Sequence, residues 1–503
     1  MFGCSRLDVR TALNQTSTKT FFLLFGTPSS RTTRAMSSST SSAAKRQQRD
    51  SISPPPAKRK VQSGTTKSAV ANFFKPSSQK PKDRTIWTER APDDDTPATL
   101  LVGRYEPEQP PTESEKRSKV AAFDLDSTLI GTASGKKHAD AAVDWKWWHP
   151  TVPGKLREMY NDQGYVASAV LFAGPADIAR YRIVVLSNQA GLVLHADPKA
   201  KTPKSTKDRV SAFKQKVNAV LTQLDIPTTI YAATEKDIYR KPRPGMWKEL
   251  CDDYDLVGQV DLKQSIFVGD AGGRIAASKT AKDFSCSDRN FADNVGIEYL
   301  TPEEFFLGEK PREFVREFDV VHYPYPDDSE PSGTESLFEK KNKQDIVLSC
   351  GPPGAGKSTF FWKHLMPLGY ERINQDLLKT REKCVQAAKE LLESGQSVAI
   401  DNTNADPDTR AVWVQLAQKH QLPIRCVWFK TPLHICEHND AVRSMNKILN
   451  PESRTALPKM AFNGFKSRFK EPKMKEGFQD ITEVDFSFRG TKEEHEAWAK
   501  YWL

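Results

Sequence analysis

Short apolar runs recur along the chain, and most of them end at polar or glycine-rich residues. Such runs are typical of strands that are buried on both faces in the parallel sheets of α/β proteins. The pattern predicts an α/β protein with two parallel-sheet domains, at residues 86–330 and 343–503, joined by a linker at 331–342. The predicted strands lie at residues 119–123, 181–186, 266–268, 346–350, 370–373 and 397–400.

The first 85 residues lack these runs and are rich in Ser, Thr, Pro, Lys and Arg. They hold 16 of the chain's 74 basic residues but only 3 of its 64 acidic residues, so the rest of the 503-residue chain is close to neutral. Too few large apolar side chains recur there to offset the entropy that folding removes. We predict a disordered basic tail at residues 1–85.

Two features of this tail suggest a subcellular localisation. Lys45 and Arg46 form one basic cluster and residues 58–60 a second, a pattern typical of nuclear import signals, although a solvated charge run has the same composition. The first 35 residues hold one acid, Asp8, and resemble a mitochondrial presequence, unless translation starts at Met36. We expect a nuclear protein and leave a mitochondrial form open.

A small apolar motif interrupts the polar tail. Val70, Phe73 and Phe74 resemble the plug by which replication and repair proteins dock on the sliding clamp, although Lys67 replaces the usual Gln. The alternative is a hydrophobic patch at the edge of the folded region. The sequence therefore offers a clamp partner as one of two interpretations.

Composition excludes several other classes of protein. The apolar run at residues 21–25 is far shorter than the roughly 20 residues that cross a bilayer, and we expect no membrane segment. The seven cysteines are an odd number, lie far apart and lack zinc-site spacing. A reduced intracellular compartment fits this pattern best, and we expect a monomer.

Functional side chains follow the predicted strands of the first domain. Asp124 and Asp126 come directly after the first strand, Ser187 ends the second, Lys241 follows in a Lys-Pro step, and Asp270 follows the third strand. In extended chain the two acids at i and i+2 point the same way, which suits one as nucleophile and one as proton donor. The order Asp, Ser, Lys, Asp resembles that of the haloacid-dehalogenase phosphatases.

The chemistry of that superfamily explains these residue types. A phosphomonoester dianion repels an anionic nucleophile, so Mg²⁺ held by Asp124, Asp126 and Asp270 would screen the charge. Asp124 would take the phosphoryl group as an aspartyl phosphate, and Asp126 would act as acid and base. Ser187 and Lys241 would bind phosphate oxygens.

Two positions depart from the superfamily pattern. Ser127 replaces the usual glycine after the second Asp, which is tolerable if the turn avoids positive φ. Arg274 stands where a second acid is expected after Asp270. Asp283 or Asp288 could supply that acid instead.

The second domain opens with a nucleotide-binding motif. The strand at 346–350 leads into GPPGAGKST, which fulfils GxxxxGK[ST] between a strand and a helix. Lys357 would reach the β and γ phosphates of ATP, and Ser358 or Thr359 would reach Mg²⁺. The residues of the motif that we assign to nucleotide binding are Gly351, Gly354, Gly356, Lys357, Ser358 and Thr359.

Three further residues favour a kinase. Asp376 follows the strand at 370–373 and could take a proton from an attacking hydroxyl. Asp401 ends the strand at 397–400, where it could assist the metal or only cap the strand. Arg443, on a predicted helix at 432–445, lies where small P-loop kinases carry an arginine that meets the transferred phosphoryl group.

A phosphatase and a kinase in one chain must act on different groups, and a nucleic acid strand has two ends. From about residue 87 onward the chain resembles the polynucleotide 5′-kinase/3′-phosphatases of eukaryotic DNA repair, on runs that include 123–130, 239–247, 267–274 and 282–289. The resemblance implies two Rossmann-like domains, ATP as phosphoryl donor, and DNA ends at nicks, gaps and double-strand breaks as substrates. It also implies the roles given above for Asp124, Asp126, Lys357, Ser358 and Asp376.

The chain departs from that family in three places. Residues 1–85 are too short and polar for the phosphopeptide-binding domain of animal members. Gln375 stands where an Arg usually precedes the base, and residues 166–180 are extra sequence without an assignable role. Two other functions stay open: a bifunctional metabolite phosphatase/kinase, and a repair scaffold with one inactive domain.

Overall fold

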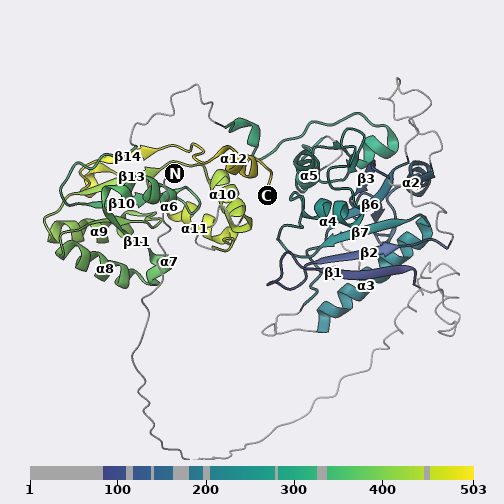
Figure 1. Cartoon of the computed structure of the whole chain (residues 1–503), viewed down its shortest axis with the longest axis horizontal. Coiled ribbons are helices and arrows are strands. Elements are labelled where there is room, and N and C mark those ends of the chain that lie inside the picture. Colours follow the sequence, from purple (N-terminus) through teal and green to yellow (C-terminus); the bar gives the residue numbers. More distant parts are fainter. Residues whose placement is uncertain are drawn as a thin grey trace, which may run out of the picture. The chain divides into compact units, whose positions relative to one another are not determined.

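The computed structural model describes residues 83–108, 117–137, 141–161, 180–195, 204–277, 281–325, 337–446 and 454–503, and Figure 1 labels the main helices and strands that they form. All of the predicted tail except its last three residues lies outside these ranges, together with the basic import clusters and with Val70, Phe73 and Phe74. The same holds for residues 166–179 of the extra segment.

Seven strands of the first domain form one sheet in the order β1-β2-β7-β6-β3-β8-β9. The five strands from β7 to β9 run parallel, as predicted. β1 and β2 form an antiparallel edge that sequence analysis did not predict, because the first of these strands is mostly polar. The strands are β1 (Thr85–Arg90), β2 (Leu100–Tyr105), β3 (Val120–Phe123), β6 (Arg182–Asn188), β7 (Thr228–Ala233), β8 (Ile266–Val268) and β9 (Glu298–Leu300), and a separate pair comprises β4 (Ile130–Gly131) and β5 (Lys146–Trp147).

Helices cover both faces of this sheet, which explains why its strands are apolar throughout. Successive residues of β3 alternate between two buried clusters: Ala121 and Phe123 join one, and Val120 and Ala122 join the other. α2 and α3 contribute to the first cluster, and α4 and α5 to the second. The helices are α2 (Val152–Asn161), α3 (Lys204–Leu224), α4 (Gly245–Asp253), α5 (Ser287–Val295), the π-helix η2 (Glu303–Leu307) and the 3-10 helix η3 (Val320–His322).

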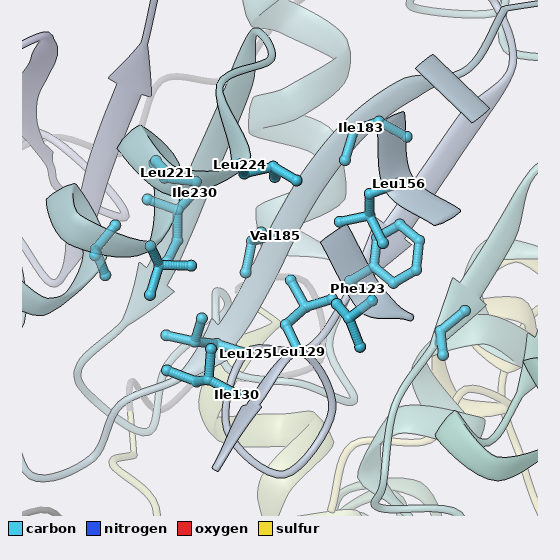
Figure 2. Close-up of a cluster of buried hydrophobic side chains, with 14 of the residues drawn as sticks. Phe123, Leu125, Leu129, Ile130, Leu156, Ile183, Val185, Leu221, Leu224 and Ile230 are labelled. Atoms are coloured by element: carbon cyan, nitrogen blue, oxygen red, sulfur yellow. The ribbon is translucent and has the colours of Figure 1, made fainter. Parts of the chain in front are cut away.

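Figure 2 shows the first cluster around Phe123 and Val185 of the central strands. Leu156 of α2 and Leu221 of α3 close it from the helical side. Burial of each such side chain contributes on the order of 1.5–3 kcal/mol. The cluster therefore anchors the end of β3, which is immediately followed by Asp124.

The second domain contains a five-stranded sheet in the order β11-β12-β10-β13-β14. All pairs in it are parallel, which confirms the predicted sheet type. Alternate residues of its central strand again face different clusters. The strands are β10 (Ile346–Cys350), β11 (Tyr370–Ile373), β12 (Ser397–Ile400), β13 (Ile424–Phe429) and β14 (Ile481–Val484).

The helices of the second domain include the predicted one at 432–445, which is observed as α10 (Leu433–Met445). The helix after the P-loop begins as α6 (Lys357–Phe360) and continues as the π-helix η4 (Phe361–Leu365). Among the helices that the structure describes, none has both the length and the apolar content needed to cross a membrane. The remaining elements are η5 (Met366–Leu368), α7 (Gln375–Leu378), α8 (Arg381–Glu393), α9 (Pro407–Lys419), α11 (Lys459–Arg468), η6 (Met474–Glu476) and α12 (Lys492–Trp498).

Candidate active sites

Three carboxylates meet at the carboxyl ends of β3 and β8. The backbone N–H of Asp124 donates to the carbonyl of Val268 at 2.9 Å, which ties the two strand ends together. Asp270 follows β8, and Asp288 lies in the first turn of α5. One carboxylate oxygen from each of the three acids lies within 4.8 Å of the other two. This arrangement unites acids that are far apart in the sequence.

Lys241 places its ammonium group between two of these acids. Its Nζ lies 2.7 Å from Oδ1 of Asp124 and 2.9 Å from Oδ1 of Asp288, and its side chain is 1% exposed. Asn188, at the end of β6, accepts from the backbone N–H of Lys241 at 2.9 Å and donates to its carbonyl at 3.1 Å. The strand that carries Ser187 therefore also fixes the lysine.

This group of charges is unbalanced, since it contains three carboxyl groups and one ammonium group. Burial raises the pKa of Asp124 to about 7 and that of Asp270 to about 8. The neighbouring carboxylates act in the same direction, whereas Lys241 opposes the shift. Converging carboxylate oxygens are the ligands that a hard divalent cation prefers, so the donor set fits the expected metal.

Arg274 explains which acid completes this group. Its Nε donates to Oδ2 of Asp283 at 2.8 Å, and its Nη1 lies 2.6 Å from Oε2 of Glu303. Asp283 is therefore occupied by the arginine. Of the two candidates that the sequence left open, Asp288 is the one that joins Asp124 and Asp270.

The turn after Asp126 uses a backbone conformation that favours glycine. Ser127 has φ of 63°, so the expectation that this turn avoids positive φ is wrong. A non-glycine residue in this region costs roughly 1–2 kcal/mol. The N–H of Ser127 donates to the carbonyl of Ile130 at 2.7 Å, which fixes the tight turn that carries Asp126.

Asp126 is held by two side chains that no motif indicated. Nε2 of Gln189 donates to its Oδ2 at 2.6 Å, and Nζ of Lys216 lies 3.2 Å from its Oδ1. The same Nε2 donates to Oγ of Ser187 at 2.9 Å. Asp126 itself lies beside the group of three acids and not within it.

The P-loop follows β10 and surrounds Lys357. Nζ of Lys357 donates to the carbonyls of Gly351 at 3.1 Å and Pro352 at 2.6 Å, and burial lowers its pKa. Gly354 and Gly356 have φ of 79° and 92°. A Cβ at Gly354 would lie 2.3 Å from the carbonyl oxygen of Cys436, so this position excludes side chains.

Asp401, which follows β12, accepts hydrogen bonds from three side chains of other segments. Its Oδ2 accepts from Oγ of Ser358 at 2.8 Å and from Nε of Arg372 at 2.8 Å, and Asn374 donates to it at 3.3 Å. Hydroxyl and carboxylate oxygens at 2.8 Å can serve as neighbouring ligands of one Mg²⁺. The structure thus links Ser358, on α6, with the end of the neighbouring strand, and both Ser358 and Thr359 line a cavity of the second domain.

A cavity of about 1420 Å³ extends from the P-loop across the second domain. Asp376, in the first turn of α7, lines it and pairs with Arg454, whose Nη1 lies 3.1 Å from Oδ2 of the acid. Arg443 also lines the cavity, and its Nη2 donates to Asp440. The backbone N–H of Gln375 donates to Oδ1 of Asn402 at 2.9 Å. The predicted base and arginine therefore share one cavity with the nucleotide motif.

Several members of the two sites carried no signal in the sequence. Lys216 lies in the interior of α3, and Arg372 lies within β11, four residues before Asp376, at a strand position that indicated no functional contact. Gln189 stands next to the Ser187 strand end, but an amide at that position indicates no particular chemistry. Only the fold shows which partners these residues meet.

Comparisons with known proteins bear on both domains. A family model described as polynucleotide kinase 3 phosphatase matches residues 119–306, and one described as an AAA domain matches residues 346–472. The bifunctional polynucleotide phosphatase/kinase of Schizosaccharomyces pombe is 34% identical over 453 residues, which cover 88% of this chain and 99% of that protein.

Two further relatives match different lengths of the chain. A protein of Acanthamoeba polyphaga mimivirus is 31% identical over 407 residues, which cover 76% of this chain and 89% of its own. The polynucleotide 3′-phosphatase ZDP of Arabidopsis thaliana is 29% identical over 193 residues, which cover 38% of this chain and 24% of its own.

Proposed function

Because this chain belongs to the family of bifunctional polynucleotide phosphatase/kinases, we propose that it repairs the ends of broken DNA strands, removing 3′-phosphates and phosphorylating 5′-hydroxyls with ATP. The observation that carries the proposal is the presence of two separate phosphate sites in one chain. One contains Asp124 and Lys241, and the other contains Lys357 and Asp376. The expected product is an end that a ligase can seal.

The first domain performs the chemistry of a haloacid-dehalogenase phosphatase in this proposal. A carboxylate oxygen of Asp124 attacks the phosphorus, and the phosphoryl group passes to it as an aspartyl phosphate. Lys241 and Ser187 bind the oxygens of the phosphoryl group, where their positive charge and hydroxyl stabilise the developing charge. Asp124, Asp270 and Asp288 would hold Mg²⁺, which supplies positive charge that offsets the repulsion between nucleophile and phosphate.

Asp126 moves the protons of both steps. It donates one to the departing O3′ and afterwards takes one from the water that releases inorganic phosphate. Its half-exposed side chain lies at the open side of the site, unlike the buried Asp124. This contrast suits an acid that must meet both an alcohol and a water molecule.

The second domain performs the transfer from ATP. Lys357 and the backbone N–H groups of the P-loop bind the β and γ phosphates, and Ser358 with Asp401 would hold the Mg²⁺ that accompanies the nucleotide. Asp376 accepts the proton of the attacking 5′-hydroxyl. Arg443 and Arg454 line the same cavity and stabilise the transferred phosphoryl group.

The basic tail supports three finer parts of the proposal. Its two basic clusters suit nuclear import, and a mitochondrial form would use the first 35 residues. Val70, Phe73 and Phe74 would dock on a sliding clamp. The tail's positive charge would add sequence-independent DNA affinity to a monomeric enzyme.

The test uses one nicked duplex that bears a 3′-phosphate and a 5′-hydroxyl. Incubation with ATP and Mg²⁺, followed by analysis of both ends, should show loss of the first group and phosphorylation of the second. Asp124→Asn should abolish only the first reaction, and Lys357→Ala only the second, which also excludes a scaffold with an inactive domain. Untouched ends together with turnover of a phosphorylated metabolite would overturn the proposal.

A further inference from the structure

Gln189 connects the phosphate-binding hydroxyl of the phosphatase site with its acid. Its Nε2 donates to Oδ2 of Asp126 at 2.6 Å and to Oγ of Ser187 at 2.9 Å. A primary amide nitrogen carries two hydrogens, and these two contacts use both of them. A carboxylate only accepts hydrogen bonds, so the nitrogen end of the amide must face Asp126. The orientation of Gln189 thus follows from the chemistry of its partners.

This contact also orients Ser187. Because its Oγ accepts from Gln189, the hydroxyl hydrogen points elsewhere and is available for a phosphate oxygen. Ser187 is 1% exposed near the end of β6, where pairing with β7 fixes its backbone. Gln189 therefore aligns a substrate donor and a proton carrier at once.

Lys216 holds the other oxygen of the same carboxylate. It reaches from α3, its Nζ lies 3.2 Å from Oδ1 of Asp126, and its side chain is 13% exposed whereas that of Asp126 is 51% exposed. The ammonium group also lies 5.7 Å from the ring of Phe213 on the preceding turn. A sheltered lysine of this kind is more restricted than an ordinary surface charge. Each oxygen of Asp126 consequently has its own partner.

We propose that Gln189 and Lys216 are positioning residues of the phosphatase, which together set the direction in which Asp126 presents its proton to the leaving oxygen. The inference rests on the proposed function, since it assumes hydrolysis of a 3′-phosphate. Neither residue needs to touch the phosphorus or the metal. Both act through Asp126, and Gln189 acts through Ser187 as well.

The step that they would control is the first one. As an oxygen of Asp124 bonds to phosphorus and the P–O3′ bond breaks, the proton of the Asp126 carboxyl passes to O3′, which leaves as a hydroxyl group. Water later bonds to the phosphorus, its proton returns to Asp126, and the bond to Asp124 breaks to release inorganic phosphate. A poorly aimed carboxyl slows the first step only where the leaving oxygen requires a proton.

Because some leaving groups need a proton and others do not, a comparison of substrates distinguishes proton positioning from phosphate binding or folding. A deoxyribose alkoxide is a poor leaving group, whereas 4-nitrophenolate leaves without a proton. The ratio kcat/KM covers binding and the steps up to loss of the alcohol, so hydrolysis of the aspartyl phosphate does not affect it. The readout is therefore kcat/KM for a 3′-phosphorylated oligonucleotide divided by kcat/KM for 4-nitrophenyl phosphate.

Gln189→Leu and Lys216→Met, made in the full chain, should each lower that quotient by roughly 10-fold to 100-fold, the effect of losing one hydrogen bond to a charged group. Lys216→Arg should restore most of it. Lys214→Met on the same helix and Gln215→Leu, whose amide meets Ser211 and not Asp126, serve as matched controls. Both should leave the quotient unchanged.

Three results would overturn the inference. An equal loss on both substrates would indicate phosphate binding or folding in place of proton positioning. Unchanged kcat/KM values on both substrates would show that neither residue matters. A loss for Lys216→Met on the oligonucleotide but not on deoxythymidine 3′-phosphate would make Lys216 a strand-binding residue. Wild-type protein that leaves 3′-phosphates intact would instead contradict the proposed function itself.

Discussion

A Cβ added to Gly269 would lie 2.2 Å from Oδ2 of Asp288. The glycine follows β8 directly, and the carboxylate approaches its backbone so closely that no side chain fits between them. The same Oδ2 accepts from the N–H of Ala271 at 3.1 Å, which restricts its retreat. Glycine is thus required here by the acid that faces it.

Gly269→Ala should therefore displace Asp288 and reduce 3′-phosphatase kcat by on the order of 100-fold, because a small misplacement of a site carboxylate has a large effect on rate. Phosphorylation of a 5′-hydroxyl by the same protein should stay within about twofold. Gly154→Ala, in α2, where the φ is not positive and nothing lies within 4 Å of the added Cβ, is the control. Full phosphatase activity in Gly269→Ala would contradict the observed approach of the two groups.

The protonation of the acids predicts how stability depends on pH. Burial raises the pKa of Asp124 to about 7 and that of Asp270 to about 8, from an ordinary value of 3.8, so the folded protein binds more protons than the unfolded chain. The contribution of these carboxyls to stability is complete below about pH 4 and is lost as the pH rises through about 7 to 8. Lys241 and Asp288 act on both carboxyls, Asp126 acts on Asp124, and Asp124 acts on Asp270.

Without divalent cation, the Tm of the phosphatase domain in the full chain should consequently fall between about pH 5.5 and 8.5, as measured by calorimetry. Asp270→Asn should flatten this slope, because the amide cannot titrate. Mg²⁺ should raise Tm more at the alkaline end, where the carboxylates are already ionised. A slope that is unchanged in Asp270→Asn would show that other groups cause it.

The positive φ of Ser127 predicts an order of stabilities. Ser127→Gly removes the steric cost but adds freedom to the unfolded chain, so its free energy of unfolding should equal or exceed that of the parent by up to about 1 kcal/mol. Ser127→Val, which is β-branched, should lower it by about 1–2 kcal/mol. Urea titration measures the free energy of unfolding of both variants. A Gly variant that is less stable than the parent would contradict the prediction.

Arg443 offers a test in the kinase domain. If it stabilises the transferred phosphoryl group, Arg443→Ala should lower kinase kcat by on the order of 100-fold to 1000-fold with a smaller change in the KM for ATP. Lys389→Ala on α8, where the lysine pairs with Glu393, is the control. A rise in KM alone would reassign Arg443 to binding of the ground state.

The basic tail is expected to make DNA affinity depend more steeply on salt concentration. Deletion of residues 1–82 removes most of the basic excess, so log Kd for DNA should respond less steeply to log salt, by about 0.7–0.9 for each DNA phosphate that the tail neutralises. Turnover at saturating substrate should not change, because both sites lie in the part of the chain that remains. Anisotropy titrations at several salt concentrations measure the slope, and equal slopes would exclude a tail contribution.

The sequence predicted the parts of both sites that stand at strand ends. Asp124 follows an apolar run directly, Asp270 follows one after a single glycine, and Lys357 follows one after the glycine-rich loop at 351–356. Parallel sheets bring the ends of neighbouring strands together whatever the length of the intervening chain. The choice between Asp283 and Asp288 could not be made in this way. It depends on the pairing of Arg274 with Asp283, which is a tertiary contact between loops.

Residues inside helices and strands were harder to anticipate. Lys216 in α3 and Arg372 in β11 occupy ordinary positions of their elements, where a basic side chain is usually solvated. Their partners, Asp126 and Asp401, lie in other elements. The local sequence pattern indicates whether a segment is a helix or a strand, but it does not indicate which residues of other elements will contact it. The roles of these two residues could therefore be recognised only in the structure.

One oxygen of Asp401 receives the hydroxyl of Ser358 and the guanidinium of Arg372. Oγ of Ser358 donates its hydrogen to Asp401 and accepts from Nη2 of Arg372 at 3.0 Å, and its second lone pair stays available for the nucleotide's cation. These two contacts orient the Ser358 hydroxyl before the nucleotide arrives, so the kinase does not have to immobilise it anew in each turnover.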